Sequence, residues 1–153
     1  MNITFFKRQA PACIAFSLCL GLGSSAYAQV AVDRAWVRAT VPNQGATGAF
    51  MRITADKDVQ LTGVRSPVAG LTEVHEMTMD NGIMKMRGVG NLQLKTGQSV
   101  ELKSGGYHLM MLELKQQIKQ GETVPLTLEF KAADASISKV EVKAIASFSP
   151  PAP

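Results

Sequence analysis

The stretch "VHEMTMDNGIMKM", residues 74–86, contains the strongest turn signal in the chain, with strand-type residues on either side of it. Asn81-Gly82 favours a two-residue type I′ turn, because both central residues of that turn need a positive φ. The flanking segments combine β-branched and other apolar residues with polar ones. The sequence therefore predicts a β-hairpin with strands over residues 71–79 and 83–89.

The length of the hairpin loop decides which side chains share a face. A two-residue loop pairs Met77 with Met86 and places both on the face of His75, while Glu76 and Arg87 form a charge pair on the other face. A three-residue loop with a bulge would instead move Met86 to the opposite face. The sequence leaves both registers open.

The rest of the chain beyond residue 30 also reads as short strands separated by turn residues. Period-two alternation is clear at Leu126, Leu128 and Phe130, and no stretch carries a long apolar helix face. About nine strands at near-regular spacing predict one all-β domain, an antiparallel β-sandwich or Greek-key barrel. The predicted strands are 32–39, 48–55, 59–66, 71–79, 83–89, 99–104, 107–114, 123–130 and 136–147.

Both histidines of the chain, His75 and His108, are followed two residues later by a methionine, Met77 and Met110. Residues two apart in a strand project from the same face, so each pair points in one direction. Six of the seven methionines beyond residue 28 lie between residues 77 and 111. Imidazole and thioether side chains are therefore concentrated in one third of the chain.

This donor set points to a soft metal ion. Thioether sulfur is neutral and soft, and it selects Cu(I) over Zn(II), Mg(II) or Ca(II). A blue-copper electron-transfer site needs a cysteine thiolate, and a catalytic zinc site needs three His, Glu or Cys ligands. The chain has two histidines, and its cysteines, Cys13 and Cys19, precede the predicted domain. The chemistry favours Cu(I) binding without electron transfer.

The competing interpretation is that these side chains only pack. Methionine commonly fills gaps in cores, and a single histidine in a strand is usually structural. We predict Trp36 to be a core anchor and Glu73 and Glu76 to be solvated, with Glu76 near the mouth of any site. Four methionines are predicted to be packing residues: Met51, Met79, Met84 and Met111.

Residues 1–28 have the pattern of a secretory signal peptide. Lys7 and Arg8 precede an apolar run over residues 12–22, and an Ala-Tyr-Ala cleavage site ends at Ala28. Without Lys7 and Arg8, fourteen basic residues remain against twelve acidic ones, a net charge of +2. The sequence has no basic patch of the kind that binds nucleic acid, and it has no nucleophile motif of the kind that hydrolases use. The expectation is a periplasmic, soluble protein that is not inserted in a membrane and is not an enzyme.

The segments "VHEMTMDNGIMKMR", "VELKSGGYHLMML" and "VPLTLEF" closely resemble the periplasmic copper chaperones of the PCu(A)C family. The family signature is a His, ten residues, a Met, twenty-one residues and His-x-Met. Here it matches His75, Met86, His108 and Met110, and the optional methionine after the first histidine matches Met77. The resemblance covers residues 30–147.

The resemblance implies a cupredoxin-like Greek-key β-sandwich over residues 29–147. The Pro-rich residues 148–153 after it are predicted to form a flexible tail. It implies a Cu(I) site with ligands His75, Met86, His108 and Met110, and Met77 as an auxiliary ligand. It also implies copper delivery to the CuA centre of cytochrome c oxidase, directly or through a thiol-bearing partner chaperone. Some members carry a C-terminal extension with further copper ligands. The tail of this chain, "SFSPPAP", contains no histidine or methionine, so no second site is expected there.

Three alternatives remain at this stage. One is a secreted β-sandwich interaction module whose methionines form an apolar contact patch, with no dependence on metal. Another is a periplasmic copper storage or resistance protein, which would use the same chemistry with a different partner. The third is a metalloenzyme, for which Glu76 is the one adjacent candidate base.

Overall fold

The computed structural model describes residues 29–151, so the predicted signal peptide lies outside the described residues. This part of the chain contains no helix, and hence none that is long and apolar enough to cross a membrane. Ten strands build the domain: β1 (Val30–Arg38), β2 (Ala46–Ala55), β3 (Val59–Arg65), β4 (Ala69–Asp80), β5 (Ile83–Val89), β6 (Leu92–Leu94), β7 (Ser99–Leu102), β8 (Tyr107–Leu114), β9 (Thr123–Ala132) and β10 (Ile137–Ser147). The predicted single all-β domain is confirmed.

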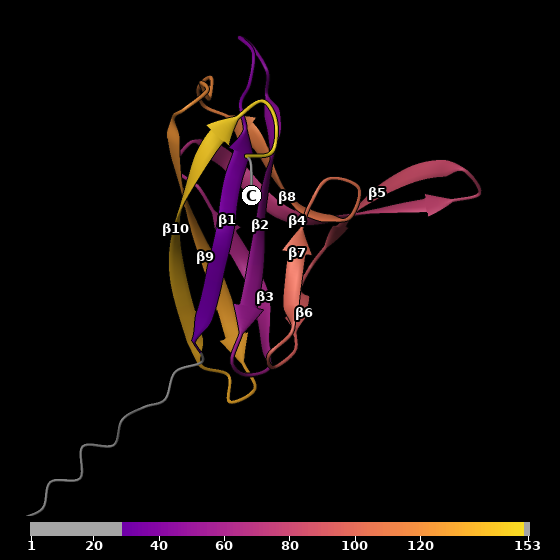
Figure 1. The fold of residues 1–153 in the computed structure, drawn as a ribbon, viewed down its shortest axis with the longest axis vertical. Coiled ribbons are helices and arrows are strands. Elements are labelled where there is room, and N and C mark those ends of the chain that lie inside the picture. Colours follow the sequence, from indigo (N-terminus) through magenta and orange to yellow (C-terminus); the bar gives the residue numbers. More distant parts are fainter. Residues whose placement is uncertain (1–28, 152–153) are drawn as a thin grey trace, which may run out of the picture.

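The strands form one continuous hydrogen-bonded sheet that folds back on itself (Figure 1). Its order is β5-β4-β8-β2-β1-β10-β9-β3-β6, and β7 pairs with β2 beside β8. Strands β3 and β4 are far apart in that order yet lie against each other. The strand pairs are antiparallel, as the predicted antiparallel sandwich requires, except that β1 runs parallel to β10.

The sequence analysis also missed β6. This strand has three residues, and it pairs with β3 while Leu92 and Leu94 enter the core. A run this short shows too little alternation to be recognised, because periodicity needs several repeats.

The core lies inside the folded sheet and follows the period-two pattern of the strands. In β9, Val124, Leu126, Leu128 and Phe130 are fully buried, while the residues between them are exposed or partly exposed. This arrangement confirms the predicted alternation at residues 126–130. Trp36 is buried as predicted, but it is not part of this central core. It stacks on Phe50 from β2 at a ring-centroid distance of 4.5 Å.

Strands β4 and β5 form a hairpin that projects from the body of the domain (Figure 1); we call residues 77–86 the arm. Asn81 and Gly82 both have a positive φ, of 49° and 78°, as a two-residue type I′ turn requires. Met77 consequently faces Met86, which is the register of the two-residue loop. The side chains from residue 79 to residue 88 are all exposed, so the arm contributes little to the core.

Charged and polar groups hold the base of the arm. The Arg87 guanidinium donates to Glu76 Oε2 from Nε at 2.9 Å and from Nη2 at 2.6 Å, as the predicted cross-strand charge pair. These hydrogen bonds, with one from the Tyr107 hydroxyl, hold the pKa of Glu76 below its ordinary value. Glu76 lies opposite Tyr107 in the β4–β8 pairing, so this cluster ties the hairpin to β8.

Candidate metal centre

Three strands bring the predicted ligands to one face of the sheet. His75 in β4 lies opposite His108 in β8, and Met77 in β4 lies opposite Met86 in β5. Directly opposed residues share a face, and so do residues two apart in one strand. Met110, two residues after His108, therefore points in the same direction. The pairing of β4 with β8 brings together His75 and His108, which are more than thirty residues apart in the sequence.

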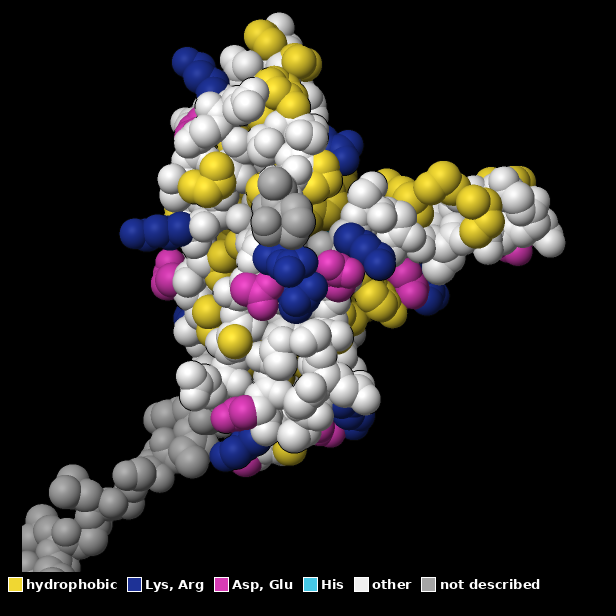
Figure 2. All heavy atoms as spheres, in the orientation of Figure 1, with side chains coloured by type: hydrophobic (Ala, Val, Ile, Leu, Met, Phe, Trp, Pro, Cys, Tyr) yellow, Lys and Arg dark blue, Asp and Glu magenta, His cyan; other side chains and the backbone are white. Residues whose placement is uncertain are grey.

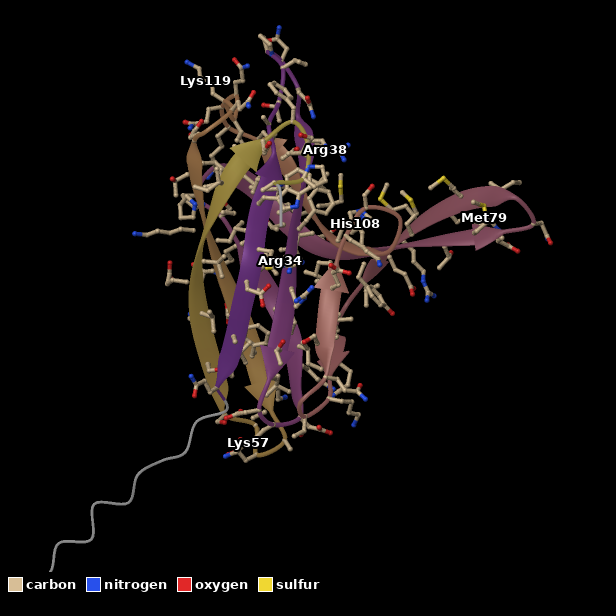
Figure 3. The ribbon with its side chains drawn as sticks, in the orientation of Figure 1. Arg34, Arg38, Lys57, Met79, His108 and Lys119 are labelled. Carbon is tan, nitrogen blue, oxygen red and sulfur yellow. The ribbon has the colours of Figure 1, made fainter. Side chains whose placement is uncertain are left out.

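Four of the five predicted ligands line one pocket with a volume of about 240 Å³: Met77, Met86, His108 and Met110. Their exposure is graded across the pocket. Met86 is half-exposed, at 50%, whereas His108 is buried, at 6%. The pocket therefore presents a thioether to solvent and an imidazole at its inner end. Figure 3 shows His108 at the junction of the arm with the body of the domain.

His108 is held in one tautomer by the backbone. Its Nδ1 donates a hydrogen bond to the carbonyl oxygen of Gly106 at 3.0 Å. A carbonyl can only accept, so Nδ1 carries the proton and Nε2 of the neutral ring carries the lone pair. His108 is thus prepared to bind a metal ion through Nε2.

His75 lies beside the pocket and does not line it, with its ring centroid 6.1 Å from that of His108. Its Nε2 is 3.0 Å from Glu73 Oε2, and its Nδ1 is buried without a hydrogen-bond partner. A carboxylate can only accept, so the neutral ring donates from Nε2 and leaves the lone pair on Nδ1. An unpaired buried nitrogen is costly, and a metal ion would satisfy it.

Glu76 was predicted to be solvated, but its side chain is only 18% exposed because it pairs with Arg87. Glu73 is solvated as predicted, with its side chain 45% exposed, but the sequence analysis missed that it also holds the His75 ring. The available signal was its position two residues before His75, which puts both side chains on one face of β4. Gly88 in β5 faces His75 in β4, and a Cβ atom added at Gly88 would lie 3.9 Å from His75 Nε2.

The methionines predicted to pack divide into two pairs. Met51 and Met111 are buried in the core, which confirms that prediction. Met79 and Met84 are 66% and 59% exposed on the arm, so for them it is wrong. The physical reason is that no other described segment covers this face of the hairpin. The alternation of residues within a strand does not predict whether another segment packs against that strand.

One wall of the pocket is aromatic. The Phe50 ring lies over Gly48, where a Cβ atom would come within 2.8 Å of the ring edge, and Gly48 faces Met110 across the β2–β8 pairing. The Arg38 guanidinium lies 5.8 Å from the centroid of the Phe50 ring. Glycine at position 48 thus leaves room for an apolar surface next to the thioether of Met110.

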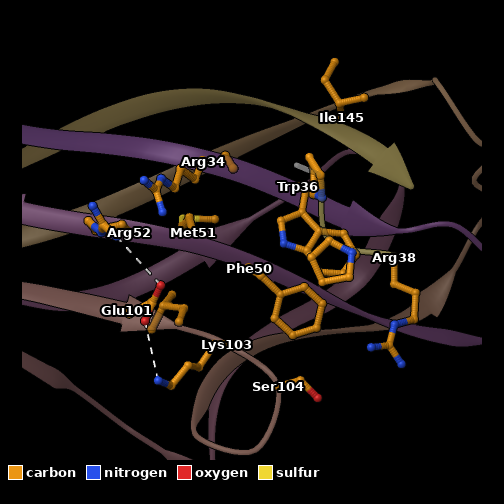
Figure 4. Close-up of a pocket in the computed structure, with 14 residues that line it drawn as sticks. Arg34, Trp36, Arg38, Phe50, Met51, Arg52, Glu101, Lys103, Ser104 and Ile145 are labelled. Carbon is orange, nitrogen blue, oxygen red and sulfur yellow. Dashed lines mark ion pairs between the residues drawn. The ribbon is translucent and has the colours of Figure 1, made fainter. Parts of the chain in front are cut away.

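A larger cavity, of about 610 Å³, also has Phe50 in its lining (Figure 4). Its apolar lining includes Trp36 and Phe50, and one of its residues, Glu101, pairs with Arg52 and Lys103. Its lining contains no histidine, so it is not the metal centre that the sequence predicts. Pro150 and Pro151, from the segment after β10, also line this cavity.

The donor set of the smaller pocket selects against hard metal ions. Within residues 29–151, no group of three or more His, Cys, Asp or Glu residues is arranged to hold a metal ion. The donors that line the pocket are instead one imidazole and three thioethers, with a second imidazole beside them. Such a set suits Cu(I), whereas Mg(II) and Ca(II) require oxygen ligands.

The chain matches a family described as "Putative lipoprotein LpqE-like" over residues 30–143. It is 30% identical over 117 residues to the "Putative lipoprotein Lxx21020" of Leifsonia xyli subsp. xyli, covering 74% of this chain and 69% of that protein.

Two solved structures also resemble the chain. The Cu(I) form of DR1885 from Deinococcus radiodurans is 28% identical, with a TM-score of 0.57 over 80% of this chain and 82% of that one. The apo PCuAC domain of PmoF1 is 19% identical, with a TM-score of 0.62 over 79% and 98% of the two chains. The cupredoxin-like fold predicted from the sequence is thereby confirmed.

Proposed function

We propose that this chain, which belongs to the LpqE-like family, is a periplasmic chaperone that binds Cu(I) and passes it to a recipient protein. Its fold, which is that of PCuAC domains, supports this proposal. The proposed ligands are His75, Met86, His108 and Met110, with Met77 as an auxiliary ligand. The proposed recipient is the CuA centre of cytochrome c oxidase, reached directly or through a thiol-bearing partner chaperone.

One observation carries this proposal: three thioethers and an imidazole line a single pocket, and a second imidazole beside it has a buried nitrogen without a partner. His75 Nδ1 and His108 Nε2 are the nitrogen atoms left free by Glu73 and Gly106. A packing role accounts for apolar thioethers, but it does not account for an unsatisfied buried nitrogen.

Neutral ligands suit a protein that must both hold and release its cargo. Cu(I) bound by imidazole and thioether forms no ion pair with the protein, so a partner can replace the ligands one at a time. Met86 is the most exposed of the four lining ligands and is the first that an incoming thiolate can displace. His108, which is buried, is then the last ligand to dissociate from the copper ion. This order requires no bond-making chemistry, and we propose that the protein is not an enzyme.

The test of the function is metal transfer. Protein loaded with Cu(I) is mixed with an isolated, copper-free CuA domain, with and without a thiol-bearing chaperone, and the proteins are then separated. We expect copper in the recipient fraction in at least one arm. Copper that stays with the protein in both arms, although a thiol chelator removes it, would favour storage over delivery.

Glu73→Gln tests the role of the carboxylate that positions His75. Outer carboxylates that orient a ligating histidine typically contribute 10–100-fold to metal affinity, so we expect Cu(I) affinity to fall by about tenfold. The measurement is competition with a chromophoric Cu(I) chelator. The matched control is Glu141→Gln in β10, away from the pocket and the arm, which should leave the affinity unchanged. Equal losses in both variants would contradict this role.

A further inference from the structure

The arm carries a row of methionines on one face, and the proposed centre uses only its inner part. Met77 faces Met86, and one rung farther out Met79 faces Met84. Because side chains alternate across a strand, all four thioethers project from the same face. Figure 3 shows sulfur atoms following one edge of the arm, with Met79 near its end. The row continues the face that carries the His75–His108 pair.

The outer pair is too exposed to be a packing feature. Met79 and Met84 are 66% and 59% exposed, and neither contributes to the core. In Figure 2 the hydrophobic side chains of the arm gather along the same edge. The opposite face has no sulfur atom, and it is mostly polar: Thr78 faces Lys85, Lys85 forms an ion pair with Asp80, and Ile83 is its one exposed apolar residue. The two faces of the arm therefore differ in kind: one offers soft sulfur donors and the other offers charges.

We infer that Met79 and Met84 form a second Cu(I) site, at the tip of the arm, where copper is captured before it reaches the pocket. This inference rests on the proposed function, since it takes Cu(I) to be the cargo. Directly opposed side chains in a hairpin have Cβ atoms about 4.5–5.5 Å apart, a separation that two flexible thioether side chains can bridge through one metal ion. The soft, neutral sulfurs select Cu(I) over divalent hard ions.

The two sites differ in strength for a physical reason. The outer pair offers two thioethers in solvent, whereas the pocket adds imidazole nitrogen and a partly buried setting. The tip should therefore bind more weakly and fill second. Successive rungs on one face are about 7 Å apart, so copper can pass from Met79 and Met84 to Met77 and Met86 by exchange of neutral ligands. Copper remains Cu(I) in this step, and no proton or electron is transferred.

The site is tested with Ag(I), a soft monovalent probe that does not change oxidation state, on protein labelled with ¹³C at the methionine methyl groups. We expect the first equivalent to shift the methyl signals of Met86 and Met110, and the second to shift those of Met79 and Met84. Outer signals that stay in place after the inner ones are saturated would overturn the inference. Inner signals that never shift would instead overturn the proposed function, so the two failures are distinguishable.

The double variant Met79→Leu/Met84→Leu keeps the apolar volume and removes both sulfurs. We expect Cu(I) stoichiometry to fall from two equivalents to one, and the pocket to load more slowly from dilute, chelator-buffered Cu(I). The matched control, Met51→Leu/Met111→Leu, makes the same exchange at two buried positions and should retain two equivalents. A double variant that still binds two equivalents would overturn the second site, and an unchanged loading rate would overturn its role in capture.

Discussion

Replacing Met86 and Met110 together by leucine should leave the domain folded and weaken Cu(I) binding by more than about 100-fold, equivalent to ~2.7 kcal/mol. Leucine keeps the volume and apolarity of methionine, and such exchanges usually cost under ~1.5 kcal/mol of stability. It removes the sulfur lone pair, which is the ligand. Both side chains line the pocket and neither is fully buried, so little packing is at risk.

The measurement combines chelator competition for Cu(I) with thermal unfolding of the copper-free protein. Met51→Leu/Met111→Leu is the control, because both residues are buried in the core and away from the pocket. It should lower the unfolding temperature more than the pocket variant does, while its Cu(I) affinity stays that of the parent. If both double variants bound copper like the parent, the pocket methionines would be packing residues. The chaperone proposal would then lose its chemical basis.

Removing the arm is expected to separate copper binding from folding. Glu76 faces Arg87, so replacing residues 77–86 by Asn-Gly joins them through a two-residue turn of the kind already present. Strand β4 still pairs with β8 from Ala69 to Glu76. The copper-free variant should unfold within about 5 °C of the parent, a change of ~1 kcal/mol. Its Cu(I) affinity should fall by more than about 100-fold.

A shorter deletion gives the matched control. Replacing residues 79–84 by Asn-Gly joins Thr78 to Lys85, which also face each other, and retains Met77 and Met86. We expect this variant to keep the affinity of the pocket and to lose only the outer pair of thioethers. A long deletion that binds Cu(I) as tightly as the short one would mean that the arm holds no ligand of the main site. A long deletion that fails to fold would mean that the arm belongs to the folding unit.

The sequence by itself determined the features that depend on neighbours along the chain. Asn81-Gly82 has the backbone preference of a tight turn, so the sequence placed the turn of the hairpin between residues 79 and 84. The alternation at Leu126, Leu128 and Phe130 likewise predicted a buried face, because a strand turns successive side chains to opposite sides. The choice between the two hairpin registers was open, and the positive φ of both turn residues closes it.

Tertiary structure decided everything that depends on what lies across the sheet or above it. The pairing of β4 with β8 sets His75 opposite His108, and no local pattern states which strands will be neighbours. The contact of Glu73 with His75 depends on side-chain rotamers, and the exposure of Met79 and Met84 depends on the absence of a covering strand among the described residues. Burial is a property of packing between distant segments, so the same residue type, methionine, is core at position 111 and solvent-facing at position 79.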